Sequence, residues 1–349
     1  MIPEYLPWSK YIMNKCLSAQ SYGSLPALDL ELSAKCSGCS CIYCDSKPAV
    51  SEVVSVTETN GEVLMNALRE SVSLGLQWVY TCGLGEPLED NNFWEILHYI
   101  KTSNVRMSMF TNGIFITDVN VARELKECNV NIILKVDTFD ECNFNKILGR
   151  PNVAAKIYAA RDYLLSAGYA QQDKYTDLAF SIVPTSLAYN GISEVVNYCK
   201  KYKIFASIGE LEYAGAVVFS NLKPTLDLTQ EQVANVRAIA NEYCQGYYMR
   251  PICPCIMTGL HIDNCGNVIV DRLTGLNCKW FMLHDPDIVI IGSIYETPIK
   301  ELFDQVIEYR KSAFRDNTDA IAKAGDVSYA FGGCGGNPKH IIELARSIV

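Results

Sequence analysis

The feature that most constrains this chain is a short loop with four cysteines, Cys36, Cys39, Cys41 and Cys44. The loop follows an apolar run over residues 27–32, which predicts a β-strand. Thiolates packed this densely repel one another, so a metal centre or a disulfide must take up their charge. Soft sulfur ligands select zinc or iron–sulfur clusters. We therefore expect a metal-binding loop at the end of a strand.

The cysteines of this chain are expected to stay reduced. The sequence has 349 residues and 15 cysteines, and Pro3, Pro7 and Lys10 interrupt any N-terminal signal peptide. Many cysteines without an export signal indicate a reducing compartment and metal thiolates rather than disulfides, which predicts a cytoplasmic protein. The net charge of −9 argues against a nucleic-acid surface. The sequence has no apolar run of ~18 residues, the length that a membrane span needs.

The hydrophobic pattern predicts strands that alternate with helices. Strand-like runs lie at 27–32, 76–82, 105–110, 131–136, 177–183 and 204–210. Helical stretches lie at 59–74, 91–103, 117–128, 152–167 and 190–202, with a short helix within 139–149. Alternation of this kind indicates right-handed βαβ units and a parallel sheet. We expect an α/β fold with six such units in a partial, TIM-type barrel, and the periodicity alone also fits a doubly wound sheet.

Capping boxes are expected at two of the helix starts. Thr59 with Glu62 and Thr229 with Gln232 both have the required spacing of a hydroxyl and a carboxylate or amide.

Polar and glycine-rich segments follow the second, third and fourth predicted strands. Gly83 and Gly85 let the backbone turn sharply, Glu86 supplies a carboxylate and Pro87 fixes φ. Later segments carry further polar groups at the strand ends: Thr111, Asn112, Gly113 and Asp137. Ligands of parallel α/β barrels bind at the carboxyl ends of the strands. These segments and the cysteine loop are therefore expected to meet in one site.

The cysteine loop and the glycine turn together resemble those of radical SAM enzymes. In that family three cysteines hold a [4Fe–4S] cluster whose fourth iron binds S-adenosylmethionine (SAM). The family spacing is Cys-x3-Cys-x2-Cys, whereas this chain has Cys36-x4-Cys41-x2-Cys44 with Tyr43 before the last cysteine. The resemblance implies Cys36, Cys41 and Cys44 as cluster ligands and Cys39 as a spectator or a resting ligand. Cys36, Cys39 and Cys44 form an alternative set, and a zinc knuckle of all four is the other interpretation.

The same resemblance assigns the SAM site. Gly83, Gly85, Glu86 and Pro87 match the element that holds the SAM amino group, with Leu84 in place of one glycine. Strand ends of this kind face the SAM ribose and carboxylate in the family, which implies Tyr43, Thr111, Asn112 and Asp137 as cofactor-binding residues. Cys82 should lie near this pocket, although packing is its expected role.

A second group of cysteines lies in the C-terminal third. The segment Thr258–Arg272 predicts a β-hairpin around Asn264–Asn267, and the segment after Ile291 predicts a short strand and a helix. This region resembles the Twitch or SPASM extension of radical SAM enzymes, which implies one auxiliary [4Fe–4S] cluster. Asp271 occupies the usual position of a cysteine, so either Asp271 is an oxygen ligand or Cys265 or Cys278 takes its place. The candidate ligands are Cys253, Cys255, Cys265, Cys278 and Cys334, and a zinc ribbon of Cys253, Cys255, Cys278 and Cys334 is the alternative.

The predicted organisation has three parts: an N-terminal segment (1–26), a radical SAM partial barrel (27–243) and an auxiliary-cluster domain (244–349). The resemblance implies an oxidoreductase that cleaves SAM reductively to a 5′-deoxyadenosyl radical and takes hydrogen from a peptide or small-molecule substrate. An electron donor such as flavodoxin or ferredoxin is the expected partner. Glu210 and Glu212 are possible substrate-facing carboxylates, and we assign no catalytic acid or base. A glycyl-radical-type activase and a non-enzymatic zinc or iron–sulfur protein are the alternatives.

Overall fold

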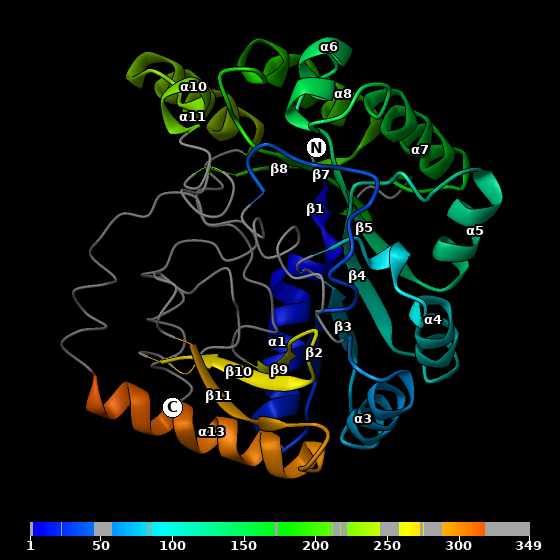
Figure 1. Cartoon of the computed structure of the whole chain (residues 1–349), viewed down its shortest axis with the longest axis vertical. Coiled ribbons are helices and arrows are strands. Elements are labelled where there is room, and N and C mark those ends of the chain that lie inside the picture. Colours follow the sequence, from blue (N-terminus) through cyan, green and yellow to red (C-terminus); the bar gives the residue numbers. More distant parts are fainter. Residues whose placement is uncertain are drawn as a thin grey trace.

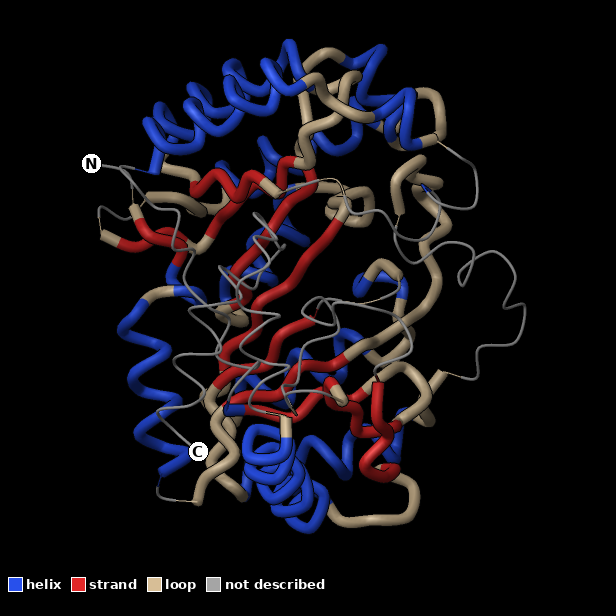
Figure 2. The backbone as a smooth tube through the Cα atoms, turned by 90° about the vertical axis from the view of Figure 1, so that its left-hand side faces the viewer, coloured by secondary structure: helices blue, strands red, loops and turns tan. Residues whose placement is uncertain are grey.

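The fold is built on one nine-stranded sheet with the strand order β11-β10-β9-β2-β3-β4-β5-β7-β8 (Figure 1). This computed structural model describes residues 3–21, 23–44, 58–81, 83, 85–171, 174–209, 211, 217, 222–244, 258–272, 275 and 288–317. The six strands from β2 to β8 are parallel and follow one another in chain order. Viewed from the side, the strands form one twisted layer (Figure 2).

The helices and strands fall close to their predicted positions. The strands of the large sheet are β2 (Ala27–Leu30), β3 (Trp78–Thr81), β4 (Arg106–Thr111), β5 (Val130–Lys135), β7 (Leu178–Ile182), β8 (Phe205–Ile208), β9 (Gly259–Ile262), β10 (Asn267–Asp271) and β11 (Ile288–Ser293). The α-helices are α1 (Lys10–Ser21), α3 (Gly61–Ser73), α4 (Phe93–Thr102), α5 (Val119–Glu127), α6 (Glu141–Ile147), α7 (Ala154–Ser166), α8 (Ile192–Tyr202), α10 (Lys223–Leu226), α11 (Gln230–Cys244) and α13 (Ile299–Asp316). All six predicted strands of the parallel sheet, from β2 to β8, and all six predicted helices, from α3 to α8, are confirmed.

The strand order decides between the two α/β architectures that the periodicity allowed. A doubly wound sheet reverses its strand order at a switch point and carries helices on both faces. Here the order from β2 to β8 never reverses, and helices α3, α4, α5, α7 and α8 line one side of the sheet (Figure 1). The doubly wound alternative is therefore wrong. Within the described residues the sheet stays open, with β8 and β11 at its two edges.

Alternation along β2 separates the two faces of the sheet. Leu28 and Leu30 belong to the apolar core that includes Leu64 and Leu68 of α3. Asp29 and Glu31 are also buried, 4% and 3% exposed, but they lie on the opposite, inward face. Because side chains of a strand alternate between faces, the inward face of β2 carries acids and the outward face carries leucines.

The segment before β2 covers part of the inward face, which its sequence did not predict. Tyr5, in β1 (Glu4–Tyr5), places its hydroxyl 3.1 Å from Ser108 Oγ of β4. The hydroxyl of Tyr80 in β3 donates to the carbonyl of Pro7 at 3.0 Å. Strand β1 also pairs with the short strand β6 (Tyr175–Thr176). These buried contacts fasten residues 3–21 to the parallel sheet.

The C-terminal hairpin extends the large sheet. Strands β9 and β10 are antiparallel and enclose the predicted turn, and β11 and α13 follow as expected. Strand β9 pairs in parallel with β2, with Asp29 opposite His261. Helix α13 packs Leu302 and Val306 into the same core as Leu260 of β9. The predicted boundary near residue 243 therefore does not interrupt the sheet.

The two predicted capping boxes have different outcomes. Thr229 and Gln232 are confirmed, because each backbone N–H donates to the other residue's side-chain oxygen at 2.9 and 3.2 Å. The Thr59 box is wrong. Asn60 caps α3 by accepting from Glu62 N and Val63 N, while the Thr59 hydroxyl donates to the carbonyl of Asn264 at 3.0 Å.

Candidate active site

The cysteine loop lies at the carboxyl end of β2 and is fastened by backbone hydrogen bonds. Ser40 N donates to Leu148 O at 2.8 Å, and Ile42 N donates to Ile147 O at 2.9 Å. These contacts tie the loop to the end of helix α6. Within the loop, Cys36, Cys41 and Cys44 are partly exposed, whereas Cys39 is 5% exposed and packs in the apolar core. The three predicted ligands therefore differ from Cys39 in their surroundings.

The glycine turn docks directly on the cysteine loop. Glu86 N donates to Lys35 O at 2.7 Å, and the Glu89 carboxylate accepts from Ser37 N at 2.6 Å. A Cβ atom on Gly85 would lie 2.3 Å from the carbonyl oxygen of Ser33. Gly85 is therefore required because two backbones meet there without room for a side chain.

Glu86 joins the glycine turn to the end of β4. Its carboxylate is 2% exposed and accepts from Thr111 Oγ1 at 2.6 Å and from Asn112 N at 2.8 Å. Burial raises the pKa of Glu86 to about 7, although the hydrogen bonds from Thr111 and Asn112 oppose the shift. Three sequence-predicted residues thus form one buried group beside the cysteine loop.

The surroundings of the thiols fit an iron–sulfur cluster. Asn112 Nδ2 donates to Cys36 Sγ at 3.6 Å, and N–H donors to sulfur are typical of cluster ligands. Burial, together with Glu86 and Cys41, raises the pKa of Cys36 to about 12, which disfavours its thiolate in the absence of a bound cation. No three His, Cys, Asp or Glu side chains among the described residues converge tightly enough for a single metal ion. The hydrogen bond from Asn112 to Cys36 Sγ is a contact of the kind that iron–sulfur ligands accept.

Asp137 is part of a buried network that includes a lysine the sequence reasoning missed. Its side chain is inaccessible to solvent, and Oδ2 accepts from Tyr43 Oη at 2.5 Å and from Lys135 Nζ at 2.9 Å. Its other oxygen accepts from Val183 N at 2.9 Å. A lysine within the apolar run 130–136 was the signal that could have identified Lys135.

A second buried group on the inward face was also missed. His261 of β9 lies between Asp29 of β2 and Glu31, the residue after β2, and none of the three is more than 4% exposed. Gly83 lies against this group, because a Cβ there would be 3.1 Å from Glu31 Cγ. The acids therefore lie directly beneath the glycine turn.

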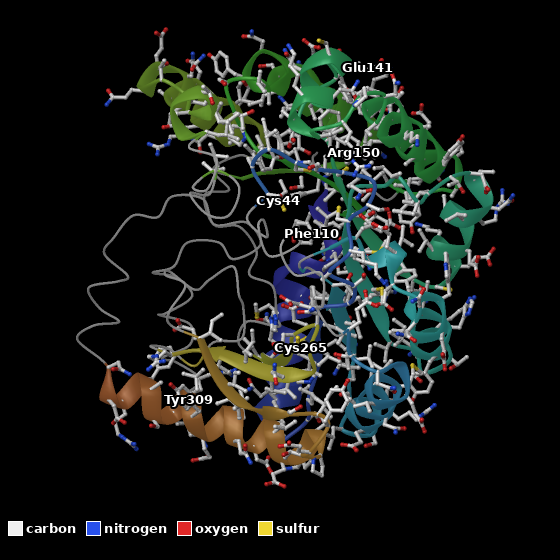
Figure 3. All side chains as sticks on the ribbon, viewed as in Figure 1. Cys44, Phe110, Glu141, Arg150, Cys265 and Tyr309 are labelled. Atoms are coloured by element: carbon white, nitrogen blue, oxygen red, sulfur yellow. The ribbon has the colours of Figure 1, made fainter. Side chains whose placement is uncertain are left out.

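Several predicted residues lie outside the described residues, namely Cys82, Leu84, Glu210, Glu212, Cys253, Cys255, Cys278 and Cys334. Of the C-terminal candidates, Cys265 is exposed on the β9–β10 turn and Asp271 is buried at the end of β10. Cys44 and Cys265 lie at separate places along the sheet (Figure 3). The auxiliary cluster stays a prediction.

Comparisons with known proteins find two curated relatives. No family model matches the chain. The mycofactocin maturase MftC of Mycolicibacterium smegmatis is 22% identical over 261 residues, 72% of this chain and 64% of that protein. A probable GTP 3′,8-cyclase of Methanococcus vannielii is 25% identical over 168 residues, 46% of this chain and 50% of that protein. The chain thus spans less than two thirds of the length of these curated relatives.

Solved structures share the fold. Streptococcus suis SuiB with bound S-adenosylmethionine matches with a TM-score of 0.56 and 15% identity, over 82% of this chain and 68% of SuiB. The anSMEcpe structure with bound AdoMet matches with a TM-score of 0.53 and 18% identity. The match covers 93% of this chain and 100% of that chain. The α/β fold with a mostly parallel sheet is therefore that of SAM-binding proteins.

Among the described residues, no helix has both the length and the apolar character that crossing a membrane requires.

Proposed function

We propose that this chain is a radical SAM oxidoreductase. The observation that carries the proposal is the junction of three strand ends: the cysteine loop after β2, Glu86 after β3, and Thr111 with Asn112 at β4. Hydrogen bonds from Asn112 reach both the Glu86 carboxylate and Cys36 Sγ. A strand-end site with sulfur donors on one side and a fixed polar turn on the other suits a cluster together with a polar cofactor.

The residues have distinct roles in this proposal. Cys36, Cys41 and Cys44 would hold a [4Fe–4S] cluster, and the turn from Gly83 to Pro87 would bind SAM beside it. The chemistry that these two groups would supply is reductive cleavage of SAM, which would provide a 5′-deoxyadenosyl radical for hydrogen abstraction from substrate. The chain itself orients the cofactors: Glu86 fixes Thr111 and Asn112, and Asn112 donates to the ligand sulfur of Cys36.

A peptide is the substrate class that the relatives favour. SuiB is known with its precursor peptide SuiA bound, with a TM-score of 0.54 to this chain, and MftC is named a mycofactocin maturase. We therefore propose oxidation or cross-linking of a peptide, with a small molecule as the second option. A flavodoxin or ferredoxin would deliver the electron. An auxiliary [4Fe–4S] cluster held by C-terminal cysteines would accept an electron from the oxidised substrate.

Anaerobic reconstitution with iron and sulfide tests the proposal. We expect about four irons per chain for one cluster or about eight for two, together with 5′-deoxyadenosine when SAM and a strong reductant are added. Zinc at both cysteine groups without nucleoside formation would contradict the proposal and favour a metal-binding scaffold. Nucleoside formation that requires a partner protein would instead favour an activase.

Glu86→Ala tests the SAM site separately from the metal. We expect SAM binding, measured by equilibrium dialysis, to weaken while iron content is retained. Glu242→Ala on α11 is the matched control, because it removes an exposed carboxylate whose ion-pair partner is the surface residue Lys200. Equal SAM affinity of the two variants would remove Glu86 from the cofactor site.

A further inference from the structure

Lys135 is a largely buried cation placed beside the cysteine loop. It is the last residue of β5, and its side chain is 17% exposed. The Nζ atom lies 2.9 Å from Asp137 Oδ2 and 4.1 Å from the centre of the Tyr43 ring, and it also donates to the Tyr43 hydroxyl. Because Tyr43 directly precedes Cys44, the ammonium group is held against the loop that carries the proposed ligands.

Hydrogen bonds join Lys135, Tyr43 and Asp137 into one network. Asp137 accepts hydrogen bonds from Lys135, Tyr43 and Val183, and its carboxylate is inaccessible to solvent. Burial of an ammonium group is costly unless a counter-charge and hydrogen bonds compensate it. Asp137 supplies this counter-charge and Tyr43 a further hydrogen bond, so the ammonium form of Lys135 is compensated in the folded protein.

We propose that Lys135 is a positioning residue that raises the reduction potential of the cluster held by Cys36, Cys41 and Cys44 and holds Tyr43 beside it. This inference rests on the proposed function. A [4Fe–4S] cluster gains one negative charge on reduction, and its potential depends on nearby charges and hydrogen bonds. An ammonium group held against the cysteine loop, in a medium less polar than water, would stabilise the reduced cluster more than the oxidised one.

Asp137 gives the proposal a second, opposite consequence. Its carboxylate cancels part of the Lys135 charge, because the two groups are 2.9 Å apart. Loss of the ammonium should therefore lower the reduction potential, whereas loss of the carboxylate charge should raise it. General loosening of the loop would not produce shifts of opposite sign.

The test is a redox titration of the anaerobically reconstituted full chain in the absence of SAM. Electron paramagnetic resonance measures the reduced cluster at each potential and so gives the midpoint potential. The variants are Lys135→Met, Lys135→Arg and Asp137→Asn. The control is Lys126→Met, because Lys126 also pairs with an aspartate, Asp177, and lies 4.8 Å from a tyrosine ring, but on α5. The control changes the net charge of the protein by the same amount as Lys135→Met.

We expect a more negative midpoint potential for Lys135→Met, a less negative one for Asp137→Asn, and wild-type values for Lys135→Arg and Lys126→Met. Equal potentials for Lys135→Met and Lys126→Met would overturn the proposal. If Lys135→Met binds less iron than wild type, Lys135→Arg distinguishes the two explanations. Normal iron content and a wild-type potential in Lys135→Arg would support a role of the positive charge. Low iron content in Lys135→Arg as well would overturn the proposal. A wild-type chain that binds no iron would refute the proposed function instead.

Discussion

His261 Nδ1 lies 3.0 Å from Asp29 Oδ2, and this pair joins β9 of the C-terminal hairpin to β2, the strand that leads into the cysteine loop. The other ring nitrogen lies 3.4 Å from Glu31 Oε1. Burial alone would lower the pKa of His261, but Asp29 and Glu31 raise it well above its ordinary value. The imidazolium form therefore belongs to the folded state.

This cluster predicts a pH dependence of stability. A raised histidine pKa means that the folded protein holds a proton that the unfolded chain releases above pH ~6.5. The stabilising contribution is thus fully present below that pH and is lost as the pH rises through the folded-state pKa. We expect His261→Gln to lower the free energy of unfolding by about 3–5 kcal/mol at pH 6 and by less at pH 9, measured by urea denaturation.

His98→Gln is the control for His261. His98 pairs with Glu124 at 2.9 Å on the surface, where its side chain is 55% exposed. We expect a change of at most ~1 kcal/mol there. A pH-independent loss in His261→Gln would show that the imidazole contributes by packing alone.

Glu86 predicts a second pH effect, at lower pH. Because its folded-state pKa is raised to about 7, the folded protein binds a proton that the unfolded chain has already lost above pH ~4.5. Stability should therefore fall as the pH rises from about 4.5 to 7, by an amount of order 3 kcal/mol. Glu86→Gln should flatten this decline in the metal-free protein, and unchanged pH profiles would contradict an ionisable role for the buried carboxylate.

Gly85→Ala should disrupt the junction between the glycine turn and the cysteine loop. The new methyl group would lie 2.3 Å from Ser33 O and 2.4 Å from Lys35 O, both backbone atoms. We expect a loss of about 1–3 kcal/mol in the free energy of unfolding and reduced iron content after reconstitution. Gly209→Ala is the control, because its methyl group would lie 3.6 Å from Ile182 O, which is an ordinary van der Waals distance. Similar iron content in both variants would argue against a tight junction.

Asn60→Ala should weaken the start of α3. The Asn60 side chain accepts from Glu62 N at 2.9 Å and Val63 N at 3.3 Å, and loss of such a cap costs about 1 kcal/mol. Asn60→Asp keeps an accepting oxygen and should retain most of the stability in thermal unfolding. If the aspartate variant loses as much as the alanine variant, the side chain stabilises the protein through something other than its cap.

The sequence alone determined which segments become strands and helices from β2 to α8, since side-chain periodicity is a local property of the chain. It also placed Cys36, Glu86 and Thr111 at strand ends, because strand ends are marked by local glycine and polar residues. The close approach of Gly85 to the carbonyl oxygen of Ser33 was not visible in the sequence, because it joins two segments that only folding brings together.

Only the tertiary structure decided which strands are neighbours. Thr59 has the local spacing of a cap, but its hydroxyl is taken by the carbonyl of Asn264, and Asn60 caps the helix instead. Lys135 has a local partner in Asp137, two residues away, but its contact with Tyr43 spans 92 residues. His261 pairs with Asp29 and Glu31, which are far away in the sequence. Burial of a charge is favourable only where counter-charges and hydrogen bonds are brought to it, and for these two groups that depends on long-range contacts.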